Sequence, residues 1–204
     1  MTVTYQNANL ATPSAGVIIK TTLDGTAHVQ HVNLDSPLDS STGALETITY
    51  PHHEVHAGSH FMYTDSVELA AAATQDYLIT TPNTAKWAHM TFYLDGSAIT
   101  QWQLFEGADR NGTTLQTVGN NNRNSATEST VTIHKGQSGG TTDGTQLWLY
   151  KGGSATNQAR TGTDAGNSEE IILKQNTKYI LRTTSGTDGN LTNMRLEYYE
   201  HTNK

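Results

Sequence analysis

The sequence predicts an all-β protein built as an antiparallel two-sheet β-sandwich. Its 204 residues are only 34% hydrophobic and 15% charged, and most of the others are Thr, Ser, Asn, Gln and Gly. Such a mixture suits β-sheets joined by polar loops. About ten segments read as strands, and turn signals separate them at intervals typical of antiparallel sandwiches. The length fits one domain, or one domain with an arm.

The clearest strand pattern lies within Tyr77–Glu106. One face of its central strand carries Ala88, Met90, Phe92 and Leu94, and the other carries Trp87, His89, Thr91 and Tyr93. This period of two is typical of a strand with one face in a core. Asp95-Gly96 favours a hairpin turn, and Ile99–Glu106 reads as the returning strand. We therefore expect this hairpin at the centre of the sandwich.

Alternation elsewhere defines the rest of the expected core. Thr145–Lys151 reads as a strand with Leu147 and Leu149 on one face, and Asn193–His201 as a strand with alternate apolar residues. The residues expected to be buried are Met90, Phe92, Leu94, Val131, Ile133, Leu147, Leu181 and Leu196.

The N-terminal region is predicted to be a separate part of the chain. Two strand-like runs, Ala15–Leu23 and Thr26–Leu34, are joined by Asp24-Gly25, and the turn-rich segment Leu34–Gly43 follows. We expect an attachment arm and linker at residues 1–44 and the sandwich at residues 45–204. A short strand is expected at Leu45–Tyr50, and a single helical turn at Leu69–Thr74, where alanines favour it.

Composition excludes several classes of function. The formal net charge is -7 and no cluster of Lys and Arg appears, which argues against direct binding of nucleic acid. There are no cysteines, so disulfides and thiolate metal sites are excluded. The N-terminus lacks the basic and apolar regions of a secretory signal, and the longest apolar run is too short to span a bilayer. We expect synthesis in a reducing cytoplasm and no membrane partner.

The segment around Tyr50–His60 holds the residues most suited to metal chemistry. In a strand, His52, Glu54 and His56 share one face, and imidazole and carboxylate suit zinc, nickel or iron. The spacing is not the helical HExxH pattern of metalloproteases. We therefore interpret these histidines as packing or inter-subunit residues, and expect no metal and no cofactor. The alternative is a metal-dependent β-sandwich enzyme in which the three side chains converge on a pocket.

Three other motifs have weaker chemical readings. Gly136–Gly140 matches G-x-S-x-G, but the following residues cannot start the helix that a nucleophile elbow needs. Asp164, Asn167, Glu169 and Glu170 lack the EF-hand pattern of a calcium site. Trp87, Trp102 and Trp148 offer sugar-stacking surfaces, although aromatic residues on strands are more often core or interface residues. No catalytic residue is predicted.

Several segments resemble tailed-bacteriophage virion structural proteins. They are Tyr50–Ser59, Leu78–Thr84, Lys86–Met90, Ile172–Tyr179 and Tyr199–Asn203. The run Ala27–Val32 is also similar, less specifically, to the attachment arms of phage structural proteins. The resemblance extends from about residue 50 to the C-terminus, and it implies a particle-bound protein with a jelly-roll-like body.

The resemblance implies a non-enzymatic capsid decoration (cement) protein on the virion surface. Its expected partners are the major capsid protein or other virion proteins, and further copies of itself in a homotrimer. Expected contact residues are Val17, Ile19, Val29 and Val32 in the arm, with Trp87, His89 and Tyr93 on the sandwich. The alternative is a tail-associated receptor- or carbohydrate-binding protein, which needs exposed tryptophans beside a groove.

Overall fold

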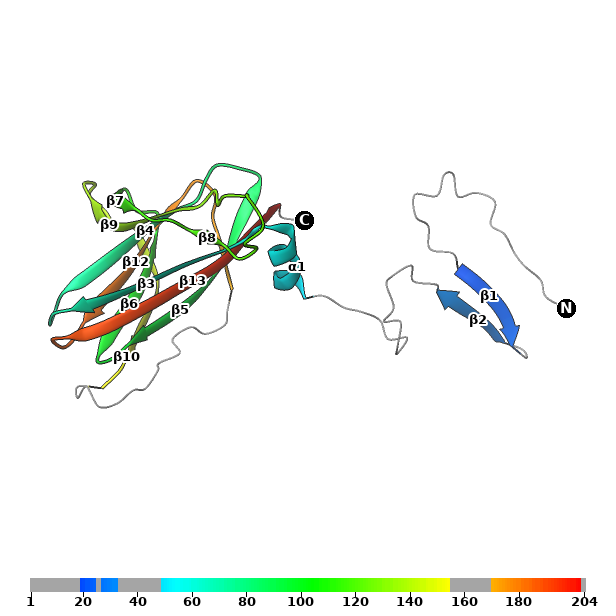
Figure 1. Ribbon diagram of the computed structural model, residues 1–204, viewed down its shortest axis with the longest axis horizontal. Coiled ribbons are helices and arrows are strands. Elements are labelled where there is room, and N and C mark those ends of the chain that lie inside the picture. Colours follow the sequence, from blue (N-terminus) through cyan, green and yellow to red (C-terminus); the bar gives the residue numbers. More distant parts are fainter. Residues whose placement is uncertain (1–18, 25–26, 33–48, 155–169, 203–204) are drawn as a thin grey trace. The chain divides into compact units, whose positions relative to one another are not determined.

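The computed structural model describes residues 19–24, 27–32, 49–154 and 170–202. The chain divides into two compact units, Met1–Ile48 and Thr49–Lys204. In the first unit, β1 (Ile19–Asp24) and β2 (Ala27–Val32) pair antiparallel (Figure 1). This confirms the two strands predicted on either side of Asp24-Gly25.

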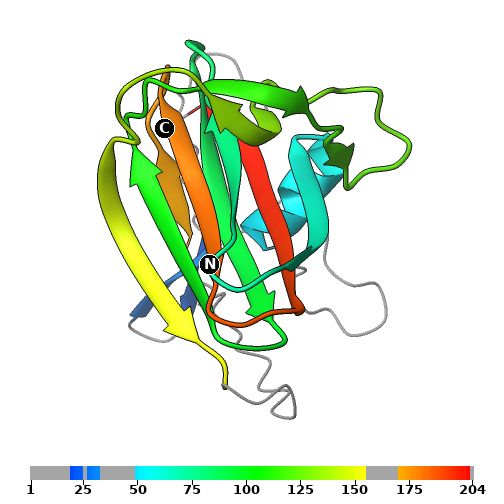
Figure 2. The same cartoon turned by 90° about the vertical axis from the view of Figure 1, so that its left-hand side faces the viewer.

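The second unit is an antiparallel sandwich of two sheets, as the sequence predicts (Figures 1 and 2). The six-stranded sheet has the order β10-β6-β12-β4-β9-β7, and the five-stranded sheet has the order β11-β5-β13-β3-β8. Their bounds are β3 His60–Leu69, β4 Thr74–Thr80, β5 Lys86–Gly96, β6 Thr100–Glu106, β7 Asn111–Leu115, β8 Gly119–Asn120, β9 Thr132–Ser138, β10 Thr145–Gly152, β11 Ile171–Leu173, β12 Lys178–Ser185 and β13 Asn190–Thr202. One helix, α1 (Tyr50–Ala57), precedes β3 among the described residues.

The strand order is that of a jelly roll. Leaving out the additional strands β7, β8 and β9, consecutive strands alternate between the sheets except where β6 and β10 pair with each other. The late strand β13 lies between β3 and β5, and β12 lies between β4 and β6. Late strands inserted between early ones are the mark of two interlocked Greek keys. The three additional strands extend the edges next to β4 and β3.

The two sheets enclose one main hydrophobic core. It includes seven of the eight residues expected to be buried: Met90, Phe92, Leu94, Val131, Ile133, Leu181 and Leu196. Among the described residues, Trp102 is the largest fully buried side chain, and it belongs to the six-stranded sheet. Because these strands show a period of two, the core face could be assigned from sequence alone.

The expected central hairpin is wrong, because β5 and β6 belong to different sheets. β5 continues through Asp95-Gly96, and the chain then crosses to the opposite sheet. The buried side chain of Asn190 fixes this crossing. It accepts a hydrogen bond from the Ala98 amide at 2.9 Å and donates to the Ile99 carbonyl at 3.1 Å. A turn-forming dipeptide thus marks a corner of the sandwich here, not a hairpin.

The prediction that Leu147 is buried is also wrong. The register of β10 against β6 shifts between Gln146 and Trp148, so Leu147 is an extra residue at a bulge. Trp148 then lies opposite buried Leu104 and packs on the core, while Leu147 is 43% exposed. A bulge changes which alternate residues face inward, and sequence periodicity does not reveal it.

Other differences are local. The strand expected at Leu45–Tyr50 is described only from residue 49 onward, because residues 45–48 lie outside the described residues. Its last residue, Tyr50, begins α1 and is not part of a strand. The residues after α1 form the long strand β3, which was not predicted. Leu69–Thr74 contains a turn with Ala72 at φ 62°, not a helical turn. The polar stretch after β6, expected to be a loop, contains the short strands β7 and β8.

Two leucines on paired strands test this core assignment. Leu104 on β6 is fully buried, whereas Leu149 on β10 is 50% exposed. Leu104→Ala should lower the free energy of unfolding by about 2–5 kcal/mol, because it leaves a cavity. The matched control Leu149→Ala should change it by no more than about 0.5 kcal/mol. Urea unfolding of both variants measures the difference, and equal losses would contradict the assigned faces.

Candidate functional site: a histidine and tyrosine cluster beside α1

Helix α1 begins and ends at recognisable signals. Thr49 is the N-cap with extended backbone, and Pro51 lies in the first turn, where its missing N–H costs nothing. Gly58 ends the helix in the left-handed conformation (φ 73°), with its N–H directed to the carbonyls of Glu54 and Val55. A side chain at Gly58 would also collide with Ser125. Pro and Gly seven residues apart are thus the boundaries of a short helix.

The expectation that His52, Glu54 and His56 share a strand face is wrong, because all three residues lie in α1. In a helix, residues four apart lie together, so His52 and His56 stack with their Nε2 atoms 2.9 Å apart. Both histidines are exposed, whereas Glu54 is buried. The three-ligand convergence required by the metalloenzyme alternative therefore does not form.

Glu54 is 5% exposed and holds the turn that follows the helix. Its carboxylate accepts hydrogen bonds from Ser59 Oγ and from His53 Nδ1, the latter at 3.4 Å. Burial by itself would raise the pKa of Glu54. The hydrogen bonds from Ser59, His53 and Tyr50 outweigh burial and hold this pKa below its ordinary value. The carboxylate thus stays ionised inside the cluster.

A ladder of rings crosses the outer face of the five-stranded sheet beside α1. Tyr199 on β13 lies opposite His60 on β3 and opposite His89 on β5. The Tyr199 ring stacks on His89 at 4.7 Å between centroids and on His60 at 6.2 Å. Tyr50 from α1 meets the Tyr199 ring edge-on at 5.6 Å. The helix thereby covers this end of the sheet (Figure 1).

Polar contacts fix the ladder in place. Glu170 accepts a hydrogen bond from the Tyr199 hydroxyl at 2.6 Å, and its other oxygen lies 2.6 Å from His89 Nδ1. Burial, followed by the bond to Glu170, raises the pKa of Tyr199, so its hydroxyl keeps its proton. His60 Nδ1 accepts from the Asn121 side chain at 2.7 Å, and burial lowers the pKa of His60. These residues form a cluster of titratable side chains that the sequence did not place together.

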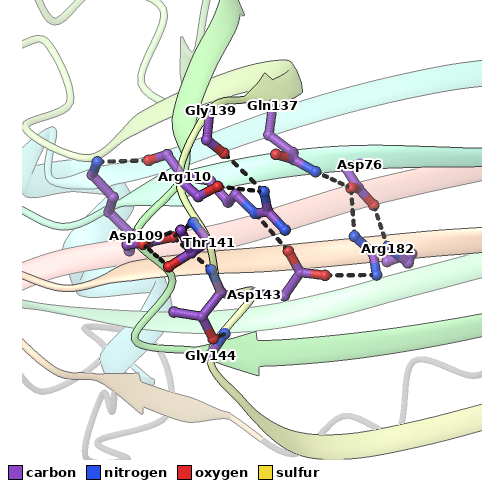
Figure 3. Close-up of polar contacts among 12 residues, drawn as sticks. Asp76, Asp109, Arg110, Gln137, Gly139, Thr141, Asp143, Gly144 and Arg182 are labelled. Atoms are coloured by element: carbon purple, nitrogen blue, oxygen red, sulfur yellow. Dashed lines mark hydrogen bonds and ion pairs between the residues drawn. The ribbon is translucent and has the colours of Figure 1, made fainter.

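A second polar cluster lies on the outer face of the six-stranded sheet (Figure 3). Arg182 on β12 binds both oxygens of Asp76 at 2.7 and 2.8 Å and reaches Asp143 at 2.9 Å. Arg110 binds the other oxygen of Asp143 at 2.8 Å and donates to the Gly139 carbonyl. The hydrogen bonds to Asp76 raise the pKa of Arg182. All four charges pair with one another, so the cluster ties the loop before β10 to the sheet.

The predicted contact residues on the sandwich fall into different environments. Tyr93 is 37% exposed and Trp87 is half-buried. His89 is only 7% exposed, because it packs against Tyr199 and Glu170. Trp102 is buried and Trp148 packs edge-on against the Phe92 ring in the core. The three tryptophans therefore do not form a shared sugar-stacking surface.

The predicted arm residues carry less structural information. Val17 lies outside the described residues. Three residues of the calcium motif weighed above, Asp164, Asn167 and Glu169, also lie outside them. Ile19 pairs with Val32 at one end of the β1–β2 hairpin, and Val29 pairs with Thr22. Their proposed contacts with a partner remain predictions.

Within the part of the chain that the structure describes, no three His, Asp or Glu side chains form a set that could hold a metal ion. No described helix is long and apolar enough to cross a membrane. Comparisons with protein-family models, curated proteins and solved structures found no match for this chain.

Glu54 gives a prediction about pH. Because its pKa is depressed in the folded protein, its contribution to stability is present above the unfolded pKa, near 4.5, and is lost as the pH falls through the folded pKa. Glu54→Gln should lower the free energy of unfolding by about 1–3 kcal/mol at pH 7. Urea unfolding at pH 7 and at several values below 4.5 should show this loss shrinking in acid.

Glu128→Gln is the matched control, since Glu128 is exposed. It should match the wild type within about 0.5 kcal/mol at each pH. A deficit of Glu54→Gln that stays constant with pH would show that the charge of Glu54 does not stabilise the turn.

Proposed function

We propose that this chain is a non-enzymatic bacteriophage virion structural protein, specifically a decoration protein that binds and stabilises the capsid. The observation that carries the proposal is the division into a jelly-roll sandwich and a separate N-terminal unit with its own hairpin. Jelly rolls recur in viral capsid domains, but also in lectins and cupins, so the fold alone names no function. The resemblance of the sequence to phage virion proteins directs the choice among them.

The N-terminal unit is the proposed attachment arm. Its hairpin has only two strands, and an isolated two-stranded hairpin is at best marginally stable in water. Ordering each residue costs about 1–2 kcal/mol of conformational entropy, which a partner surface offsets. The edges of β1 and β2 suit strand addition to a capsid subunit. Val17, Ile19, Val29 and Val32 supply apolar anchors in this proposal.

Self-association into a trimer is the second part of the proposal. Three large apolar side chains on the five-stranded sheet are exposed: Tyr93, Ile172 and Leu191. The two edge strands of the other sheet also expose apolar residues, Leu147 and Leu149 on β10 and Leu115 on β7. Sheet edges and apolar patches of this kind favour association unless they are covered. The proposal assigns the face of Tyr93 to contacts between copies.

Deleting residues 1–44 tests the arm. Virions assembled with the full chain should contain it, and virions assembled with the truncated chain should lack it, because the arm supplies the anchoring contacts. Mass spectrometry of purified particles measures incorporation, and a thermal melt checks that the truncated sandwich still folds. Wild-type occupancy by the truncated chain would place the anchor in the sandwich instead. Absence of the full chain from virions would overturn the proposed function.

The oligomeric state gives an independent test. Sedimentation of the purified 22.1 kDa chain at micromolar concentration should give three times the mass of one chain. Tyr93→Asp should shift the protein toward the monomer, because it places a charge in the proposed contact. Asn124→Asp, at an exposed position outside both sheets, is the control and should leave the trimer intact. A wild-type monomer in solution and on the particle would contradict the trimer.

A further inference from the structure

Two imidazoles from neighbouring strands face each other in the cluster beside α1. The Nε2 atoms of His89 on β5 and His201 on β13 are 2.8 Å apart. His201 Nδ1 lies 2.8 Å from the carbonyl oxygen of Thr202, which only accepts, so this nitrogen carries the hydrogen. His89 Nδ1 lies 2.6 Å from a carboxylate oxygen of Glu170 and donates to it. In this tautomer, each ring presents an unprotonated Nε2 to the other.

Two lone pairs at this separation repel unless a cation lies beside them. The ring centroids of His89 and His201 are 4.3 Å apart, and their Nε2 atoms are 2.8 Å apart. The centroid distance is thus larger by only about 1.5 Å. In a straight N–H···N bond, the distance between the centroids would exceed the distance between the nitrogens by the radii of both rings. Those two radii together are larger than the observed difference. The rings are thus inclined to the line joining their nitrogens. A shared proton prefers the straight arrangement, whereas a chelated metal ion requires an inclined one.

We propose that His89 and His201 chelate a divalent transition-metal ion through their Nε2 atoms. With metal–nitrogen distances of about 2.0–2.1 Å, nitrogens 2.8 Å apart subtend an angle of about 85–90° at the metal. A right angle suits the square-planar and tetragonal sites of Cu²⁺ or Ni²⁺ better than tetrahedral zinc. The site therefore selects Cu²⁺ first and Ni²⁺ next, which also follows the general order of affinities.

The surroundings of both ligands match those of metal-binding histidines. Such histidines donate their other ring nitrogen to a carboxylate or a backbone carbonyl, which fixes the ring and increases its basicity. Glu170 serves His89 in this way and is itself held by the Tyr199 hydroxyl, while the Thr202 carbonyl serves His201. His89 is buried and its ring stacks on Tyr199, whereas His201 is partly exposed. A metal ion can thus enter from the side of His201.

The site supplies two protein ligands, and water completes the coordination. Metal binding there joins the C-terminal end of β13 to β5 beyond their backbone pairing. The His52–His56 pair on α1 offers a similar separation of 2.9 Å, but both side chains are exposed, and the described residues provide no hydrogen bond to either Nδ1. Fixing that pair costs more side-chain entropy, so it is the weaker site and must be removed in the test.

The experiment uses the full chain without an affinity tag and with His52→Ala and His56→Ala as the background. Titration with Cu²⁺ should show one tightly bound ion per chain, with two imidazole nitrogens in its electron paramagnetic resonance spectrum. Adding His201→Ala should remove this binding. Adding Glu170→Gln instead should weaken it by about 10–100-fold, because the carboxylate orients His89. Ni²⁺ should bind more weakly than Cu²⁺, and Zn²⁺ should lack their right-angle geometry.

Unchanged binding after His201→Ala, or loss of all binding in the His52→Ala, His56→Ala background, would overturn the proposal. A measurement on the wild-type chain guards against misfolded variants. Nitrogen-15 spectra of the imidazoles should show both rings protonated at Nδ1 without metal, and Cu²⁺ should broaden His89 and His201 together. A single proton shared between the Nε2 atoms, with no response to Cu²⁺, would equally refute the metal site.

Discussion

The position of β13 is the constraint on which the rest of the sandwich depends. This last strand pairs with β3 through ten residue pairs and with β5 through eleven. It separates two strands that are early in the chain, so the five-stranded sheet cannot close until the C-terminal segment is in place. The same pairing decides which outward side chains meet, because Tyr199 lies opposite both His60 and His89. The ring ladder is therefore a consequence of topology.

Two buried polar side chains of this sandwich, Asn190 and Glu200, are each held by several hydrogen-bond partners. Asn190, at the start of β13, satisfies backbone groups at the crossing from β5 to β6. Glu200, near the other end of the strand, is 3% exposed and accepts hydrogen bonds from Ser129 Oγ and from the amides of Thr130 and Val131. An unpaired buried carboxylate or amide would cost several times what each bond contributes. These residues fix the corners of the sandwich, which the apolar core leaves open.

The outer faces of the two sheets are used differently. On the six-stranded sheet, paired charges around Arg182 and Asp143 hold a loop in place (Figure 3). On the five-stranded sheet, α1 covers one end, where imidazoles and tyrosines gather, and exposed apolar residues such as Tyr93 lie elsewhere on it. One sheet face thus combines the proposed cation site with a surface suited to association. The two proposals use different side chains and can fail separately.

The sequence by itself determined the fold class, the alternating core residues and the two strands near the N-terminus. These features rest on local periodicity, since residues such as Met90, Phe92 and Leu94 show their common face within one strand. Pro51 and Gly58 also carried the signals for α1, although the alternation of His52, Glu54 and His56 was read as a strand. Composition correctly favoured sheets with polar loops.

Only the tertiary structure decided which strands are neighbours and which histidines meet. Local pattern cannot show that β5 and β6 enter different sheets, because a turn dipeptide serves a corner as well as a hairpin. Nor can it show the bulge that turns Leu147 outward. His89 and His201 are 112 residues apart in the chain. They meet because β13 pairs with β5 in one register, and strand register is set by the packed core as a whole.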